Sequence, residues 1–591
     1  MEKPSLLGRI LIWRLKHLSY KQLLLILSVI IGLASGMGAV IIKNSVHFIQ
    51  LLLTQGFAKE YQNYLYFIYP AIGILAVVLI IKLVFRQHVG HGIPTVLYAI
   101  SKNNGIIKRH NMISSIITSA LTVGFGGSVG LEGPTVATGA AIGSNIGRFF
   151  RLNHKQIIMM LGCASAGAMA AIFKAPIAAI VFALEVIMLD LTMASLIPLL
   201  IASVTATLTS YALLGQNVLY SFELKEKFMM GDIHIYILLG ILAGFVSIYY
   251  TRMYMFIGSI FDKIGGWHIK VLTGGLALGI LIFLLPSLYG EGYSAINSCL
   301  HGDYSYLFNN SLYYSYKDNI YAILILFIAI LLFKVIATSI TFGSGGIGGI
   351  FAPTLFTGAN FGLFFAKFFN ELDIKHISES NFALVGMAGL ISGVLHAPLT
   401  AIFLIAEVTG GYQLFVPLMI VSTISYATMR IFQSNSVYTI QLAKRGELMT
   451  HDKDKAVLSL MKVDKLIEKN FISVSPDDTL GDLVDVISKS TRNIYPVTDE
   501  NNMFLGIVFL DHIRHIMFKP DMYNVVYVRD LMFTPLEYVN IDDSMEEVAD
   551  KFQSSGKFNM PVLKDGKYMG FVSRANVFSS YRKMLKHFSE D

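Results

Sequence analysis

The chain has 591 residues, of which 54% are hydrophobic and only 14% are charged. Soluble domains carry about 25% charged residues, so this composition excludes a soluble protein for most of the chain. The net charge of +7 does not indicate nucleic-acid binding, because the basic residues gather near the N-terminus and just after the last apolar run, at Lys444 and Arg445. The two cysteines, Cys163 and Cys299, are isolated and predict neither a disulfide framework nor a metal site.

Residues 1–20 predict a short amphipathic helix lying at the membrane surface. From 21 to 443 apolar segments follow one another closely, and the uncharged window 23–42 is long enough to span a bilayer. Similar runs occur at about 61–81, 191–222, 271–290, 335–366 and 408–429. Runs this long and uniform indicate membrane helices rather than barrel strands. The flanking basic residues predict that both termini are cytoplasmic.

Residues 126–134 read GGSVGLEGP and combine glycine, proline and one carboxylate in apolar surroundings. The glycines permit close backbone approach, and Pro134 suits the first turn of a helix. The stretch therefore predicts a break followed by a helix that begins inside the membrane. The unpaired N–H groups and positive dipole end of such a helix form an anion site, for which the Glu132 carboxylate would compete. The alternative is a close helix crossing in which glycine only permits contact.

An internal repeat relates two halves of the membrane part, at about 21–222 and 232–443. Residues 174–186 match residues 396–408 at an offset of 222, and Pro134 corresponds to Pro353 at an offset of 219. Upstream, residues 90–94 loosely echo residues 290–293. Homologous halves with helices broken by Gly and Pro are typical of transporters and channels whose site lies near the membrane midplane. The repeat therefore favours the anion site over simple helix packing.

Three glycine–proline signatures occur in a fixed order: GHGIP at 90–94, GLEGP at 130–134 and GIFAP at 349–353. Together with Tyr438 near the end of the last helix, they resemble the CLC family of chloride channels and chloride/proton exchangers. The resemblance covers about 21–443. It implies an all-α polytopic membrane fold with two inverted halves, tilted and re-entrant helices, and a homodimer with one pore per subunit.

The resemblance also implies roles for individual residues. The family holds a dehydrated chloride ion with backbone N–H groups and hydroxyls, and Glu132 resembles its gating glutamate. The anion-binding residues that it implies here are His91, Gly92, Gly130, Leu131, Glu132, Gly133, Gly349, Ile350, Phe351 and Tyr438. Because these loops contain no lysine or arginine, we expect the anion to be held by dipoles, weakly enough for release.

Three positions depart from the family pattern. His91 stands where many members have a serine that contacts the central anion; the imidazole either binds the anion or points away. Leu131 replaces the basic residue common before the gating glutamate, which weakens attraction of anions at the outer mouth. Val186 occupies the position at which many exchangers carry a second glutamate as internal proton relay, and valine cannot carry a proton. We expect Glu185 and its counterpart Glu407 to be structural.

These departures divide the functional hypotheses. Loss of the relay at Val186 favours a passive chloride channel gated by Glu132, and the alternative is a chloride/proton antiporter. A remote alternative from another class is an intramembrane hydrolase using the buried carboxylates Glu132, Glu185 and Glu407. No enzyme activity, metal or cofactor is expected. We expect the protein to lie in a cell membrane, the inner membrane of a bacterium, where it contacts lipid.

The composition changes abruptly after the membrane part, with a linker at 444–460 and a charged tail at 461–591. The tail repeats a strand–helix–strand–strand–helix pattern that resembles tandem cystathionine-β-synthase (CBS) domains, at about 461–520 and 527–591. Such pairs often bind adenine nucleotides. Of the residues usual for ribose binding, only Ser573 and Asn576 are in place, and Asn replaces the acid. We therefore expect a structural, dimerising role rather than nucleotide sensing.

Overall fold

The computed structural model describes residues 17–54, 62–87, 89–90, 92–187, 193–216, 220, 222, 226–444, 458 and 461–589. The chain divides into two compact units, Met1–Leu448 and Met449–Asp591. Most of the predicted surface helix at 1–20 and of the linker at 444–460 lies outside the described residues.

The first unit consists of helices arranged in two successive sets. The first set is α2 (Tyr20–Thr54), α3 (Gln62–Ile80) with a π-helical extension (Ile81–Phe85), α4 (Ile93–Lys102), α5 (Asn111–Gly124), α6 (Glu132–Phe149), α7 (His154–Phe173), α8 (Pro176–Glu185) and α9 (Met193–Leu214). The second is α10 (Ile233–Lys263), α11 (Trp267–Leu284), α12 (Tyr293–Leu300), α13 (Ile320–Gly343), α14 (Phe351–Glu371), α15 (Glu379–Leu395), α16 (Pro398–Val408) and α17 (Phe415–Phe432), followed by α18 (Ile440–Lys444). Short 3-10 turns lie at Met230–Asp232, Pro286–Leu288, Ser305–Leu307 and Tyr314–Tyr316.

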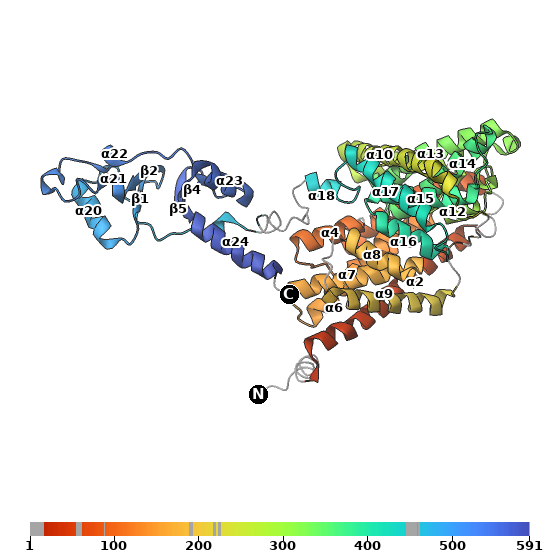
Figure 1. The fold of residues 1–591 in the computed structure, drawn as a ribbon, viewed down its shortest axis with the longest axis horizontal. Coiled ribbons are helices and arrows are strands. Elements are labelled where there is room, and N and C mark those ends of the chain that lie inside the picture. Colours follow the sequence, from red (N-terminus) through yellow and green to blue (C-terminus); the bar gives the residue numbers. More distant parts are fainter. Residues whose placement is uncertain are drawn as a thin grey trace. The chain divides into compact units, whose positions relative to one another are not determined.

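The two sets repeat the same packing (Figure 1). Helix α2 packs on α9 as α10 packs on α17, and α6 packs on α7 as α14 packs on α15. Among the described residues, eight helices are long and apolar enough to cross a membrane. The predicted all-helical membrane fold is therefore confirmed.

The apolar run predicted at 335–366 is not one span. Helix α13 ends at Gly343 and α14 begins at Phe351, with the glycine-rich segment between them. A continuous helix cannot form there because Gly345 has a φ of 105°, outside the helical region.

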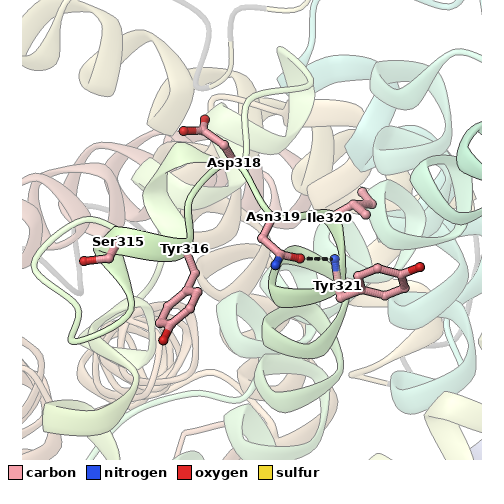
Figure 2. A pocket seen from close by; sticks show the side chains of 6 residues that line it. All are labelled: Ser315, Tyr316, Asp318, Asn319, Ile320 and Tyr321. Atoms are coloured by element: carbon pink, nitrogen blue, oxygen red, sulfur yellow. Dashed lines mark hydrogen bonds between the residues drawn. The ribbon is translucent and has the colours of Figure 1, made fainter.

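Figure 2 shows how α13 begins: the Asn319 side chain accepts a hydrogen bond from the N–H of Tyr321 at 2.9 Å. The surrounding surface hollow encloses about 510 Å³ and carries no buried charged group.

Helices α8 and α16, which lie side by side, cap each other. Glu185, the last residue of α8, accepts hydrogen bonds from the N–H groups of Leu399 and Thr400 at 3.0 and 2.8 Å. Glu407 in turn accepts from the N–H groups of Ile177 and Ala178 at 3.1 and 2.7 Å. Both carboxylates thus satisfy N–H groups that a helix start leaves unpaired. This arrangement agrees with the structural role expected for the pair.

The second unit contains two similar halves. The first has α20 (Leu480–Lys489) and the antiparallel strands β1 (Ile494–Thr498) and β2 (Phe504–Phe509), followed by α21 (Leu510–Ile513). The second has α22 (Val528–Leu531), β3 (Val539–Asn540), α23 (Met545–Ser555), β4 (Asn559–Lys564), β5 (Lys567–Ser573) and α24 (Arg574–Ser589). Its sheet has the order β3-β4-β5, with β3 parallel and β5 antiparallel to β4. Capping boxes at Thr479 and Ser544 start α20 and α23 alike.

Candidate anion site

The three glycine–proline signatures meet at one point inside the first unit. Gly130 and Gly349 exchange two backbone hydrogen bonds of 2.7 Å each, although 219 residues of chain separate them. Gly92 has a φ of 81°, and a Cβ there would lie 2.6 Å from the carbonyl carbon of Gly133. A Cβ on Gly133 would lie 3.1 Å from the Cα of Gly349. The glycines are therefore required because three backbone segments touch.

Helices α6 and α14 begin at this junction with open tips. Their N-cap residues are Leu131 and Ile350, whose side chains form no cap. By contrast, Asn153 closes the start of α7 with a capping box. The N–H groups of the first turn therefore have no partner within either helix. Two positive dipole ends face a shared point, which is an arrangement that binds anions.

The carboxylate of Glu132 lies between the two tips. The side chain is fully buried, and Oε1 accepts a hydrogen bond from the hydroxyl of Tyr293. Oε2 has no hydrogen-bond partner among the described residues. The carboxylate as a whole also interacts electrostatically with the backbone N–H groups of Glu132 and Ala352. A Cβ on Gly130 would lie only 2.1 Å from this oxygen. The negative group thus takes the place that the open tips offer to an anion.

Tyr438, just before α18, belongs to the same site. Only 5% of its surface is exposed, and its hydroxyl has no hydrogen-bond partner among the described residues. It interacts electrostatically with Glu132. A buried hydroxyl without a partner is costly, so this group is placed to donate to an anion. His91, also predicted here, lies outside the described residues.

Some of the predicted anion ligands already have protein partners. The N–H groups of Gly130 and Gly349 are used by the bridge between the two segments. The N–H of Leu131 donates to Oε1 of Glu291 at 3.2 Å. In this conformation these three N–H groups are therefore not available to an anion. The N–H groups of the first turns, from Glu132, Gly133, Ile350 and Phe351, remain as the candidate donors.

Sequence reasoning missed the charged residues around the gate. Lys334 is fully buried and donates to the carbonyl groups of Leu288 and Gly290 at 3.3 and 3.0 Å. Both Lys334 and Lys43 interact electrostatically with Glu291. Neither lysine lies in the three glycine–proline loops, so the expectation that dipoles hold the anion stays a prediction. A signal existed, since charges inside apolar helices are expensive and usually functional.

The family model described as "Voltage gated chloride channel" matches residues 72–430. The chain belongs to this family. The CBS domain model matches residues 463–519 and 528–583, so the tail of this CLC protein is a CBS pair. Both predicted resemblances are confirmed.

Relatives with different printed activities match the chain. The H(+)/Cl(-) exchange transporter ClcA of Vibrio cholerae is 27% identical over 432 residues, covering 70% of this chain and 88% of the relative. The chloride channel protein CLC-f of Arabidopsis thaliana is 25% identical over 456 residues, covering 68% of this chain and 56% of the relative. As a CLC family member, the protein transports anions through a multi-pass membrane unit.

Solved structures share the fold. A slow cyanobacterial Cl-/H+ antiporter superposes with a TM-score of 0.61 at 22% identity, covering 72% of this chain and 98% of the other. A eukaryotic CLC transporter superposes with a TM-score of 0.59 at 17% identity, covering 94% of this chain and 99% of the other. These likenesses establish the architecture alone.

Val186, at the position predicted for a proton relay, has an apolar side chain that carries no proton. Val186 is 5% exposed and follows directly on the end of α8. Its neighbour Glu185 is held by the tip of α16, where Thr400 adds a third hydrogen bond through Oγ1 at 2.7 Å. Glu185 is therefore bound in a helix cap rather than free to take over the relay.

A cavity of about 650 Å³ lies within the CBS unit, lined in part by Ser573 and Asn576. Ser573 donates to Glu468 at 2.6 Å, and the Asn576 side chain donates to the carbonyl of Leu466 at 3.1 Å. Glu468 also pairs with Arg492 at 2.9 Å. Both candidate ribose-binding side chains are thus engaged, and a carboxylate faces the cavity that a phosphate would enter.

Proposed function

We propose that this chain is a passive chloride channel whose pathway passes between the tips of α6 and α14 and is closed by Glu132. The observation that supports the proposal is the position of the Glu132 carboxylate, which is buried between two uncapped helix starts. An ionised carboxylate and a chloride ion compete for the same N–H groups. Protonation removes the charge that holds the side chain there, so an anion can then replace it.

The channel is favoured over an exchanger by the lack of a proton carrier at the predicted relay position, Val186. Coupled exchange requires a group that accepts protons on the side away from Glu132. Val186 has no titratable atom, and Glu185 is fixed by three hydrogen bonds at the start of α16. Chloride movement without a matching proton movement follows from this arrangement.

A chloride/proton antiporter is the second candidate. It is supported by the likeness to the ClcA exchange transporter and by the protonatable gate itself. Water or another carboxylate would then carry protons to Glu132. The hydrolase alternative has no such support, because Glu185 and Glu407 cap helices instead of facing Glu132.

Paired flux measurements on the purified protein in liposomes separate the two candidates. A chloride gradient is imposed without a proton gradient, and both ions are followed. The channel predicts chloride flux with no uphill proton movement, whereas stoichiometric proton pumping would establish the antiporter. The Glu132→Gln variant tests the site: flux that no longer depends on pH supports the gate, and unchanged pH dependence refutes it.

We further propose a homodimer in a cell membrane, with both termini in the cytoplasm. Membership of the CLC family supports the dimer, and the basic residues at both ends of the membrane unit support the orientation. Cross-linking in native membranes and protease accessibility of the CBS unit test these two statements.

A further inference from the structure

A second carboxylate, Glu291, lies beside the gate. It precedes α12, and its Oε1 accepts the hydrogen bond from Leu131, the residue directly before Glu132. Glu132 is completely buried, whereas Glu291 is partly accessible. The two carboxylates interact electrostatically. Glu291 therefore lies beside the gate, interacts with its charge and is less completely buried than Glu132.

The charged groups around Glu291 come from several elements. Lys43 on α2, Lys334 on α13 and Glu132 on α6 all interact with it electrostatically, as do the hydroxyl groups of Tyr220 and Tyr293. Helices α14 and α15 also pack against α12. Of their charged residues, Lys367 pairs with both Glu371 and Glu379. Glu379 lies next to Gly302, beyond the far end of α12.

Lys334 supplies positive charge to this cluster of carboxylates. Its ammonium group is fully buried, bonds to the carbonyls of Leu288 and Gly290, and lies 4.7 Å from the ring centroid of Phe356. With Lys43, it offsets the charge of Glu291 when that carboxylate is ionised. Burying a cation without a carboxylate partner costs free energy. The cluster is therefore more stable with one glutamate ionised than with none.

We propose that Glu291 is a positioning residue that sets the pH at which the gate opens. This inference rests on the proposed gating by Glu132. When Glu291 is ionised, its negative charge opposes ionisation of Glu132, so the gate takes up a proton and opens at a higher pH.

The test is the pH profile of chloride flux from liposomes, measured on the full-length protein at constant chloride. For coupled carboxylates the interaction is about one pH unit or more. Glu291→Gln should therefore shift the pH of half-maximal flux by about one unit toward acid. Glu291→Asp, which retains the charge, should stay close to the wild type.

Controls separate charge from structure. Glu407→Gln, a membrane carboxylate that caps α8, should leave the pH profile unchanged. Equal shifts in Glu291→Gln and Glu291→Asp would overturn the proposal, since they would assign the effect to the lost hydrogen bond with Leu131. An unshifted Glu291→Gln profile would also overturn it. If Glu132→Gln abolishes pH dependence in the same assay, such a result contradicts only the role of Glu291; if it does not, the proposed gating itself fails.

Discussion

Adding one methyl group beside the gate should force it open. In Gly130→Ala the new Cβ would lie 2.1 Å from Oε2 of Glu132, whereas ordinary contacts begin at 3.4 Å. The carboxylate must therefore move by at least 1.3 Å, from 2.1 to 3.4 Å. The same Cβ would lie 2.8 Å from the Cβ of Ala352, so the test variant is Gly130→Ala combined with Ala352→Gly.

The size of the effect follows from the contact that is lost. Displacing the carboxylate removes its hydrogen bond from Tyr293, and a hydrogen bond to a charged group contributes about 1.5–3 kcal/mol. Because about 1.4 kcal/mol corresponds to a factor of ten, the closed population should fall by about ten- to a hundredfold. Chloride flux at neutral pH should rise accordingly and lose most of its dependence on pH.

Chloride efflux from liposomes at neutral and acidic pH measures this change, with Ala352→Gly alone as the matched control. Glu132→Gln provides the reference for a gate without charge. If the double variant folds, retains wild-type flux at neutral pH and still requires acid to open, the carboxylate does not lie between the tips and the reasoning is refuted.

Three further predictions concern other contacts. Tyr293→Phe removes the hydroxyl donor to Glu132 and should raise the pH of half-maximal flux, because the ionised carboxylate loses a partner; an unchanged profile would show that this bond does not hold the gate. Glu185→Ala leaves N–H groups of α16 unpaired and should lower the free energy of unfolding in detergent by about 1–3 kcal/mol without changing the pH profile. If the variant instead lost coupling between chloride and proton movement, Glu185 would be a proton relay after all. In the CBS unit, burial acts to raise the pKa of Asp543, but the hydrogen bonds and charge of Lys551 and the contacts with Asn540 hold this pKa below its usual value. Its stabilising contribution, under about 1 kcal/mol for such a pair, is therefore present above about pH 4 and lost as the pH falls through the lowered pKa. Chemical denaturation of the 449–591 unit between pH 7 and pH 3 should show this loss in the wild type and not in Asp543→Asn.

The backbone part of the site could be predicted from sequence because glycine and proline constrain the chain locally. The three signatures predicted helix starts, and the internal repeat predicted that two of these starts would meet. The two backbone hydrogen bonds between Gly130 and Gly349 hold these two helix starts together. The apolar run at 335–366 spans the break between α13 and α14, because hydropathy alone does not register a glycine hinge; the signature at 349–353 is what predicted this break.

The side-chain part could not be read in the same way. Lys334 and Glu291 lie 43 residues apart in sequence and meet only because the loop before α12 folds against α13. Leu131 was expected to offer its N–H to an anion, but Glu291 accepts that hydrogen bond instead. Reciprocal capping by Glu185 and Glu407 likewise depends on helices from different halves lying side by side. Such long-range electrostatic partners carry no local signature.

The proposed chloride pathway requires an anion to lie between the starts of α6 and α14. Bromide, which scatters anomalously, can be introduced into crystals of the Glu132→Gln protein in place of chloride. We predict an anomalous peak within hydrogen-bond distance of the N–H groups of Ile350 and Phe351 and of the Tyr438 hydroxyl. Well-ordered tips at 130–134 and 349–353 with no peak between them, and bromide bound elsewhere, would contradict the account.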